Sequence, residues 1–282
     1  MGQLFLFIWV LLWPELPAQR TVPLRRAGAH LLVDGVWVNG QGPFRFLLDT
    51  GAQSTALHES IARRLGLRPT YLVETVSVNG SLPAPAARVT NVTSGRATAL
   101  DLEVVLRGVP RFDGILGQNF LHHFRYGIDL TRMLLHIEAD PEPAGIRLPL
   151  ETSNGRPVVR LGTWRLVIDS GSPALILFRN APPLPNAARV TLSAAAGDSP
   201  AMRATLPILA FGKFHLKNVP VISRPDSDRE EDGLLPVTLF KSVWVNPRGG
   251  YVILEPPRPT VRRQTATAAD RPPPRERRSP SS

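Results

Sequence analysis

Two short motifs occur twice in this 282-residue chain, in the same order. Leu47–Gly51 (LLDTG) recurs as Val167–Gly171 (VIDSG), an offset of 120 residues between the aspartates (169 − 49). Asp113–Gly117 (DGILG) recurs as Asp232–Pro236 (DGLLP), an offset of 119 (232 − 113). Two motifs repeated at nearly one spacing predict a tandem duplication with two similar lobes.

The residues between the motifs are typical of β-structure. In the first half, two β-rich segments flank Asn39-Gly40, a pair that supplies positive φ in hairpin turns. This predicts a hairpin that ends at Asp49. The predicted strands of this half are Leu31–Val38, Phe44–Leu48, Tyr71–Val78, Ala86–Val92 and Ala99–Leu106. The fold class is therefore expected to be mainly β.

One short helix interrupts the predicted strands. Leu57, Ile61 and Leu65 are spaced by four residues, which favours an amphipathic helix. In the second half, prolines at 182, 183 and 185 interrupt the corresponding region, so this helix is expected to be shortened or lost there.

Each copy of the first motif places one carboxylate in a turn at the end of an apolar strand. Gly51 and Gly171 allow close approach of the backbone, and pseudo-twofold symmetry could bring Asp49 and Asp169 together. Two adjacent carboxylates resist double ionisation and hold one proton between them. One can then accept a proton from water while the other hydrogen-bonds a substrate carbonyl, a chemistry that requires no metal or cofactor.

At these residues the sequence resembles the aspartic proteases, and more narrowly the bacterial retropepsin-like proteins with two lobes in one chain. The resemblance is carried by Phe46–Ala52, by Leu65-Gly66-Leu67 and by Asp113–Leu121. It implies a bilobal acid-protease (pepsin/retropepsin-like) β-barrel fold from a tandem duplication. It also implies an aspartic endopeptidase in which Asp49 and Asp169 hydrolyse peptide bonds.

The resemblance assigns roles to further residues. It implies that the hydroxyl groups of Thr50 and Ser170 brace the two aspartates, beside Gly51 and Gly171. A flap that closes over a peptide or protein substrate is expected, by its position, at the hairpin around Val78-Asn79-Gly80-Ser81.

The second lobe departs from the motif. Pro236 replaces the glycine that matches Gly117, and Pro173 closely follows Asp169. The sequence therefore leaves open whether the turn around Asp169 has the same geometry as the turn around Asp49. The alternative function is a catalytically impaired peptide-binding or scaffolding protein that retains the protease fold.

The two ends of the chain differ from its middle. Leu4–Trp13 is an apolar run of ten residues closed by Pro14, which is typical of a signal peptide and too short to span a bilayer. An uncleaved N-terminal anchor is the alternative. The formal net charge is +10, but from Arg258 onward seven arginines face two acidic residues, so half of the excess lies in a proline-rich tail. A solvated tail is favoured over specific nucleic-acid binding.

These features divide the chain into predicted segments. They are a signal peptide (1–18), an N-terminal lobe (19–140), a linker (141–157), a C-terminal lobe (158–256) and a disordered basic tail (257–282). The mature protein is expected to be exported, periplasmic or secreted, without a membrane span. It is expected to be a monomer, because each repeat supplies one aspartate.

Other residues invite simpler interpretations. His122 and His123 have no partner carboxylate at ligand spacing and are predicted to be structural or exposed. Trp37, Trp164 and Trp244 are expected to pack in the core or between the lobes. The absence of cysteine excludes thiol nucleophiles and thiolate metal sites.

Overall fold

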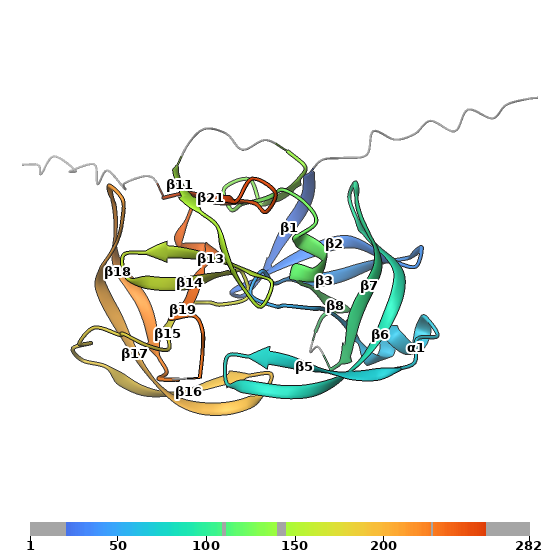
Figure 1. Cartoon of the computed structure of the whole chain (residues 1–282), viewed down its shortest axis with the longest axis horizontal. Coiled ribbons are helices and arrows are strands. Elements are labelled where there is room, and N and C mark those ends of the chain that lie inside the picture. Colours follow the sequence, from blue (N-terminus) through green and yellow to red (C-terminus); the bar gives the residue numbers. More distant parts are fainter. Residues whose placement is uncertain (1–20, 109–110, 140–144, 227, 258–282) are drawn as a thin grey trace, which may run out of the picture.

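The structure is a computed structural model that describes residues 21–108, 111–139, 145–226 and 228–257. It is mainly β, as expected, with two lobes side by side and a further group of strands above them (Figure 1). The predicted signal peptide and almost all of the predicted basic tail lie outside the described residues.

Seven strands of each lobe pair in the same order. In the first lobe the order is β2 (His30–Val38), β3 (Gln41–Leu48), β8 (Gly114–Leu116), β4 (Thr55–His58), β7 (Ala97–Arg107), β6 (Gly80–Ser94) and β5 (Tyr71–Ser77). In the second lobe it is β13 (Arg156–Leu161), β14 (Trp164–Asp169), β19 (Gly233–Pro236), β15 (Leu175–Leu177), β18 (Phe214–Ser223), β17 (Gly197–Phe211) and β16 (Ala188–Ala194). This correspondence supports the tandem duplication.

Local sequence explains the hairpin that leads to the first motif. β2 and β3 pair antiparallel, with Leu32 opposite Leu47, and the turn uses Asn39 at φ 50° and Gly40 at φ 71°. Positive φ is sterically cheap for these two residue types. The hairpin therefore delivers Asp49 directly after a buried strand end at Leu48.

The two lobes differ in their helices. The predicted helix is α1 (Glu59–Arg64), which is capped by the side chain of His58 and buries Ile61 and Ala62. Among the described residues of the second lobe, no α-helix follows β15, in agreement with the prolines there. A short helix, α2 (Gln118–Leu121), follows β8, and the 3-10 turn η1 (Val237–Leu239) takes its place after β19.

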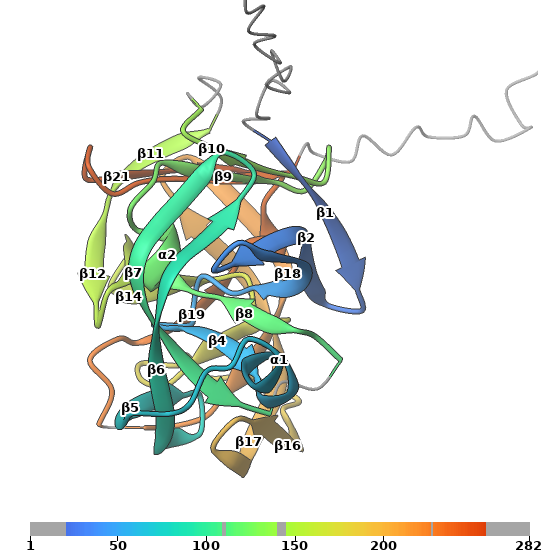
Figure 2. The same ribbon diagram turned by 90° about the vertical axis from the view of Figure 1, so that its right-hand side faces the viewer.

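A sheet formed by both halves of the chain joins the lobes. Its order is β11 (Ile146–Pro149), β21 (Tyr251–Glu255), β20 (Ser242–Asn246), β9 (Tyr126–Asp129), β10 (Leu134–Ile137) and β1 (Thr21–Ala27). In its middle, β9 and β20 pair antiparallel, with Ile128 opposite Val243. Figure 2 shows these strands at one end of the molecule.

Two sequence expectations need correction. Residues 141–157 were predicted as a linker, but they contain β11 and β12 (Glu151–Ser153), which pair with β21 and β13. Trp37 was expected to pack in the core or between the lobes, but it is 40% exposed on β2, whereas Trp244 is buried in the joining sheet over Gly127. Trp37 alternates with the buried Val36 and Val38, so the pleat of the strand turns its side chain outward.

Candidate active site

The carboxyl groups of Asp49 and Asp169 are held in equivalent turns. Each turn follows a strand that pairs parallel with the second motif, β3 with β8 and β14 with β19. Asp49 Oδ1 accepts hydrogen bonds from the amides of Gly51 and Ala52, both at 3.0 Å. Asp169 Oδ1 accepts them from Gly171 at 2.7 Å and Ser172 at 3.0 Å. Both carboxyl groups are therefore oriented by their own backbone.

The glycine of each motif lies against the carboxyl group of the other lobe. A Cβ atom added to Gly51 would lie 2.4 Å from Cγ of Asp169, and one added to Gly171 would lie 2.8 Å from Cγ of Asp49. Neither position leaves space for a side chain. The structure therefore brings the two sequence motifs, and with them the two aspartates, into one site between the lobes.

Thr50 and Ser170 cross-link the two turns. The amide of Thr50 donates to Oγ of Ser170 at 3.0 Å, and the amide of Ser170 donates to Oγ1 of Thr50 at 2.9 Å. Each hydroxyl group also donates, at 2.8 Å, to a carbonyl of the opposite strand, Thr50 to Ile168 and Ser170 to Leu48. All these groups are buried, so the network holds the two turns in a fixed relation.

Burial makes both carboxyl groups harder to ionise, and the charge of Asp49 adds to this effect at Asp169. Burial raises the pKa of Asp49, although the amides of Gly51 and Ala52 partly oppose this effect. Burial and then the charge of Asp49 raise the pKa of Asp169 to about 8. A hydrogen bond with Asp169 lowers the pKa of Asp49, whereas the charge of Asp49 raises the pKa of Asp169. Both directions favour an ionised Asp49 beside a protonated Asp169.

Gln118 and Asn119 also support the first turn, a role that the sequence motifs did not predict. The buried Gln118 side chain donates to the carbonyl of Thr50 at 3.0 Å and to the hydroxyl of Tyr126 at 3.1 Å. Asn119 accepts from the amide of Thr55 at 2.8 Å. Val237 and Thr238 stand at the matching positions of the second lobe, so this support belongs to the first lobe alone. The polar pair directly after DGILG was the available signal.

The prolines of the second lobe do not disturb the turn around Asp169. Pro236 ends β19 opposite Asp169 with φ −70° and ψ 132°, which is ordinary extended backbone. Pro173 follows Ser172, whose amide still reaches Asp169. The carboxyl group of Asp169 therefore receives the same pair of backbone donors as Asp49.

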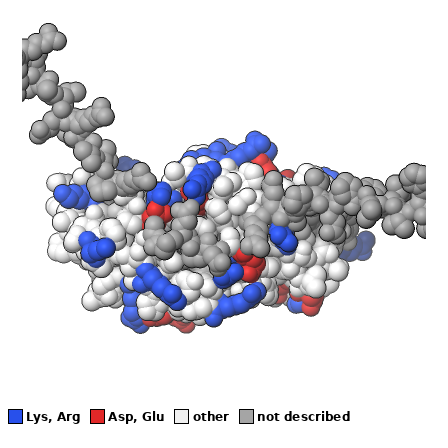
Figure 3. Space-filling view, turned by 90° about the horizontal axis from the view of Figure 1, so that it is seen from above, with Lys and Arg blue, Asp and Glu red and all other residues white. Residues whose placement is uncertain are grey.

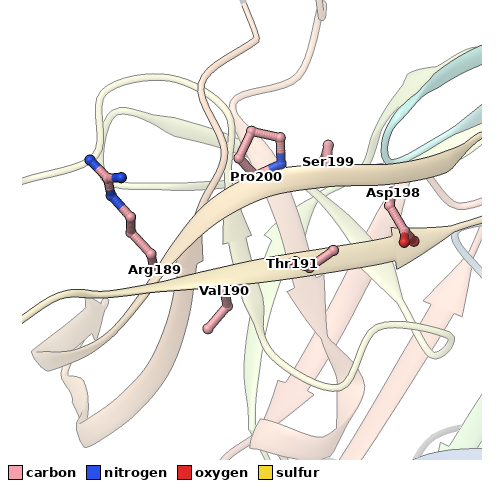
Figure 4. Close-up of a pocket in the computed structure, with 6 residues that line it drawn as sticks. All are labelled: Arg189, Val190, Thr191, Asp198, Ser199 and Pro200. Atoms are coloured by element: carbon pink, nitrogen blue, oxygen red, sulfur yellow. The ribbon is translucent and has the colours of Figure 1, made fainter.

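The expected flap is the β5–β6 hairpin, with Val78 and Asn79 in its turn and Gly80 and Ser81 beginning β6. Its tip contacts the matching β16–β17 hairpin of the second lobe. Asn79 Nδ2 donates to the carbonyls of Leu192 and Gly197, both at 2.6 Å, and Ser199 Oγ donates to Asn79 Oδ1 at 2.7 Å. The two hairpins approach each other in Figure 1, and Figure 4 shows Ser199 beside a shallow hollow on β16–β17.

Apolar contacts accompany these hydrogen bonds between the two hairpins. Val78 and Leu192, one from each hairpin, pack against a buried cluster of the second lobe. The members of that cluster are Val158, Val167, Ile176, Phe178 and Leu234. Val167 of this cluster lies on β14, which ends two residues later at Asp169. The described conformation is one in which the hairpin tips are closed on each other.

Other candidate features lie outside this site. His122 and His123 directly follow α2 and are exposed, in agreement with the sequence prediction, with ring centroids 4.0 Å apart. Within the described ranges, no group of three His, Asp or Glu residues could hold a metal ion. In the face shown in Figure 3, basic side chains are scattered and acidic ones lie beside several of them. No described helix has the length and apolarity needed to cross a membrane.

Comparisons with known proteins place the first lobe in a family context. The family model described as "Aspartyl protease" matches residues 35–120. Among solved structures, a retropepsin-like aspartic protease from Rickettsia conorii is 27% identical over 42% of this chain and 86% of that chain, with a TM-score of 0.32. A search of curated proteins returned no match.

Proposed function

We propose that this chain, a retropepsin-like protein of the aspartic protease superfamily, is an endopeptidase whose catalytic pair takes one aspartate from each lobe. The observation that carries the proposal is the mutual approach of the two motifs, in which each glycine contacts the opposite carboxyl group. The family match covers only the first lobe, so the contribution of Asp169 rests on this geometry.

The environments of the two carboxyl groups support different roles. Asp49, which ionises first, accepts a proton from a water molecule as that water attacks the peptide carbonyl carbon. Asp169, protonated up to about pH 8, donates a hydrogen bond to the carbonyl oxygen as negative charge develops there. Collapse of the tetrahedral intermediate then returns the proton from Asp49 to the leaving amine. This transfer leaves Asp49 ionised and Asp169 still protonated, so the pair is ready for another water molecule once the carboxylic acid and amine products leave.

The cross-lobe sheet and the hairpins support two further parts of the proposal. Because β9 and β20 join the lobes within one chain, a monomer contains a whole site. The β5–β6 hairpin is proposed as the flap, and a peptide or protein substrate enters when its tip separates from β16–β17. The apolar cluster beneath Val78 favours substrates with a large apolar side chain near the scissile bond.

Peptide cleavage tests the function directly. The full chain is incubated with a diverse peptide library from pH 4 to pH 8, and products are identified by mass spectrometry. We expect cleavage that is lost in Asp49→Asn and in Asp169→Asn. It should be retained in Asp101→Asn, which removes an exposed carboxylate paired with Arg88 on the outside of β7. A peptide in which a hydroxyl-bearing tetrahedral carbon replaces the scissile carbonyl should inhibit the cleavage, because it mimics the tetrahedral intermediate.

The same samples test the alternative function. A folded protein that binds library peptides but cleaves none of them would favour a peptide-binding or scaffolding role. Activity that survives Asp169→Asn but depends on dimer formation would instead favour a pairing of two first lobes.

Export is proposed from the N-terminal sequence alone, and sequencing the N-terminus of the mature protein tests cleavage after Ala18.

A further inference from the structure

A buried ion pair lies in the second lobe, outside the groups that touch the reacting atoms. Arg156 donates to Oε1 of Glu231 at 3.1 Å, and their side chains are only 4% and 2% exposed. Ser153 contributes its carbonyl as an acceptor for Arg156 and its hydroxyl as a donor to Glu231 and Glu230. A buried charge is stable only with such compensation, so these groups depend on one another.

This pair lies one strand away from Asp169. β13 and β14 are antiparallel with Val158 opposite Val167, and the same register continued by two residues sets Arg156 opposite Asp169. Residues opposite each other on neighbouring strands share a face of the sheet. Accordingly, the positive charge of Arg156 partly opposes the rise in the pKa of Asp169 that burial and Asp49 cause.

Arg229 connects the same carboxylate to the other lobe. Its Nη1 donates to Oε1 of Glu231 at 3.4 Å, and its Nη2 donates to the carbonyl of Ser77, the last residue of β5 in the proposed flap. Its guanidinium carbon lies 4.7 Å from the ring centroid of Phe178, and the side chain is 8% exposed. Asp226 accepts from its Nε at 3.2 Å.

We propose that Arg229 is a positioning residue that links closure of the β5–β6 hairpin to the buried Arg156–Glu231 pair beside Asp169. The proposal rests on the proposed function, because it assigns Arg229 to the control of that site. With the hairpin closed, Glu231 is shared between two arginines, and the charge of Arg156 is less fully neutralised. Opening removes the Ser77 acceptor, releases Arg229 toward water, and leaves Glu231 to Arg156 alone.

The charges around this network define the sign of the effect. Asp169 faces Asp49 from the first lobe and Arg156 from β13, while Glu231 faces Arg156, Arg229 and, through Ser153, Glu230. Replacing Arg229 by glutamine removes a positive charge and leaves Glu231 less compensated. Both changes favour the protonated form of Asp169, so its pKa should rise.

Carboxyl titration measures this effect without any need for catalysis. The full chain is labelled with 13C at aspartate carboxyl carbons and titrated by NMR, with Asp49→Asn and Asp169→Asn used for assignment. We expect Arg229→Gln to raise the upper apparent pKa of the pair by about 0.5 or more, as a nearby charge in a protein interior does. Arg160→Gln, an exposed charge loss on the same strand as Arg156, should leave it unchanged.

Hydrogen exchange supplies the second readout. Arg229→Gln should speed exchange of the backbone amides at the β5–β6 tip, whereas Arg160→Gln should not. Arg156→Met should raise the upper pKa at least as much as Arg229→Gln without this change in exchange. If Arg156→Met does not fold, the paired replacement Arg156→Met with Glu231→Leu removes both buried charges and should raise the pKa as well.

The proposal is overturned if Arg229→Gln folds and leaves both the titration and the hairpin exchange as in the wild type. It is also overturned if only one of the two readouts moves, because the residue would then act on the hairpin or on the carboxyl pair but not link them. These outcomes are independent of the proposed function. Failure of the proposed function would appear as absent peptide cleavage by a wild-type chain whose carboxyl pair still shows the raised upper pKa.

Discussion

Thr50 and Ser170 exchange amide-to-hydroxyl hydrogen bonds across the two lobes, at 3.0 and 2.9 Å, although they are 120 residues apart. Neither turn contains all the partners of its own polar groups. The hydroxyl groups reach on to strand carbonyls of the opposite lobe, so loss of one side chain affects both turns. The carboxyl pair is therefore a property of the assembled lobes.

Replacing Thr50 by valine should destabilise the protein and reduce turnover. The change removes the acceptor of the Ser170 amide and the donor to Ile168, and leaves buried polar groups unpaired. We expect a loss of about 3 kcal/mol in the free energy of unfolding, measured by urea denaturation. Thr50→Ser retains the hydroxyl group and should remain close to the wild type. Equal losses in the two variants would contradict a role for the hydroxyl.

Stability should fall as the pH rises toward 8. The pKa of Asp169 is about 8 in the folded protein, and that of an aspartate in an unfolded chain is about 3.9. The folded state therefore binds the proton of Asp169 more tightly than the unfolded state does. The stabilisation that this proton gives is complete below about pH 4, decreases as the pH rises, and is lost as the pH passes through about 8. Asp169→Asn should flatten this part of the curve, measured as thermal midpoint against pH. An unchanged slope would show that Asp169 titrates normally.

The pH dependence of peptide cleavage should be a bell with an unusually high upper limb. Activity requires Asp49 ionised and Asp169 protonated, and the pKa values of both are raised. The kcat/KM should therefore decline on the acid side when Asp49 is protonated and on the basic side near pH 8 when Asp169 ionises. A maximum confined to strongly acidic solution would contradict this assignment of the shared proton.

Gly127 should tolerate no side chain. A Cβ atom there would lie 2.2 Å from Cε3 of Trp244, in the strand pair that joins the lobes. Gly127→Ala should lower the thermal midpoint and disturb cleavage, because the two aspartates depend on this junction. Gly108→Ala is the matched control, since nothing lies within 4 Å of a Cβ atom at that position.

Sedimentation of the wild type should show a monomer, with cleavage rate proportional to enzyme concentration.

Removing the side chain of Asn79 should loosen the closed hairpins. Asn79→Ala loses the donors to Leu192 and Gly197 and the acceptor for Ser199. Amides at the tips of both hairpins should exchange faster, and KM should change more than stability does, because the contacts are local. Thr93→Val serves as the control, because it removes an exposed hydroxyl group of β6 that pairs with Thr98 of β7. Unchanged amide exchange would show that the Asn79 side chain does not hold the hairpin tips together.

The mainly β class, the repeated motifs and the helix at Ile61 were predictable from the sequence, because they follow from local periodicity, turn residues and spacing along the chain. The prolines at 182, 183 and 185 likewise predicted the missing second helix. Such signals act over a few residues and survive in any tertiary arrangement. The candidate carboxylates were predictable for the same reason, since each stands in its own local turn.

Only the tertiary structure decided which side chains meet across the lobes. The contacts of Asn79 with Leu192 and of Arg229 with Ser77 join residues 113 and 152 positions apart. No local preference encodes such pairs, because they depend on how two twisted sheets are set against each other by the β9–β20 junction. Gln118 was not predictable for a related reason, because Thr50 and Tyr126 reach its side chain only once the first lobe is folded. Likewise, β11 within residues 141–157 pairs with β21, the last described strand, so only the folded chain shows that these residues form strands rather than a linker.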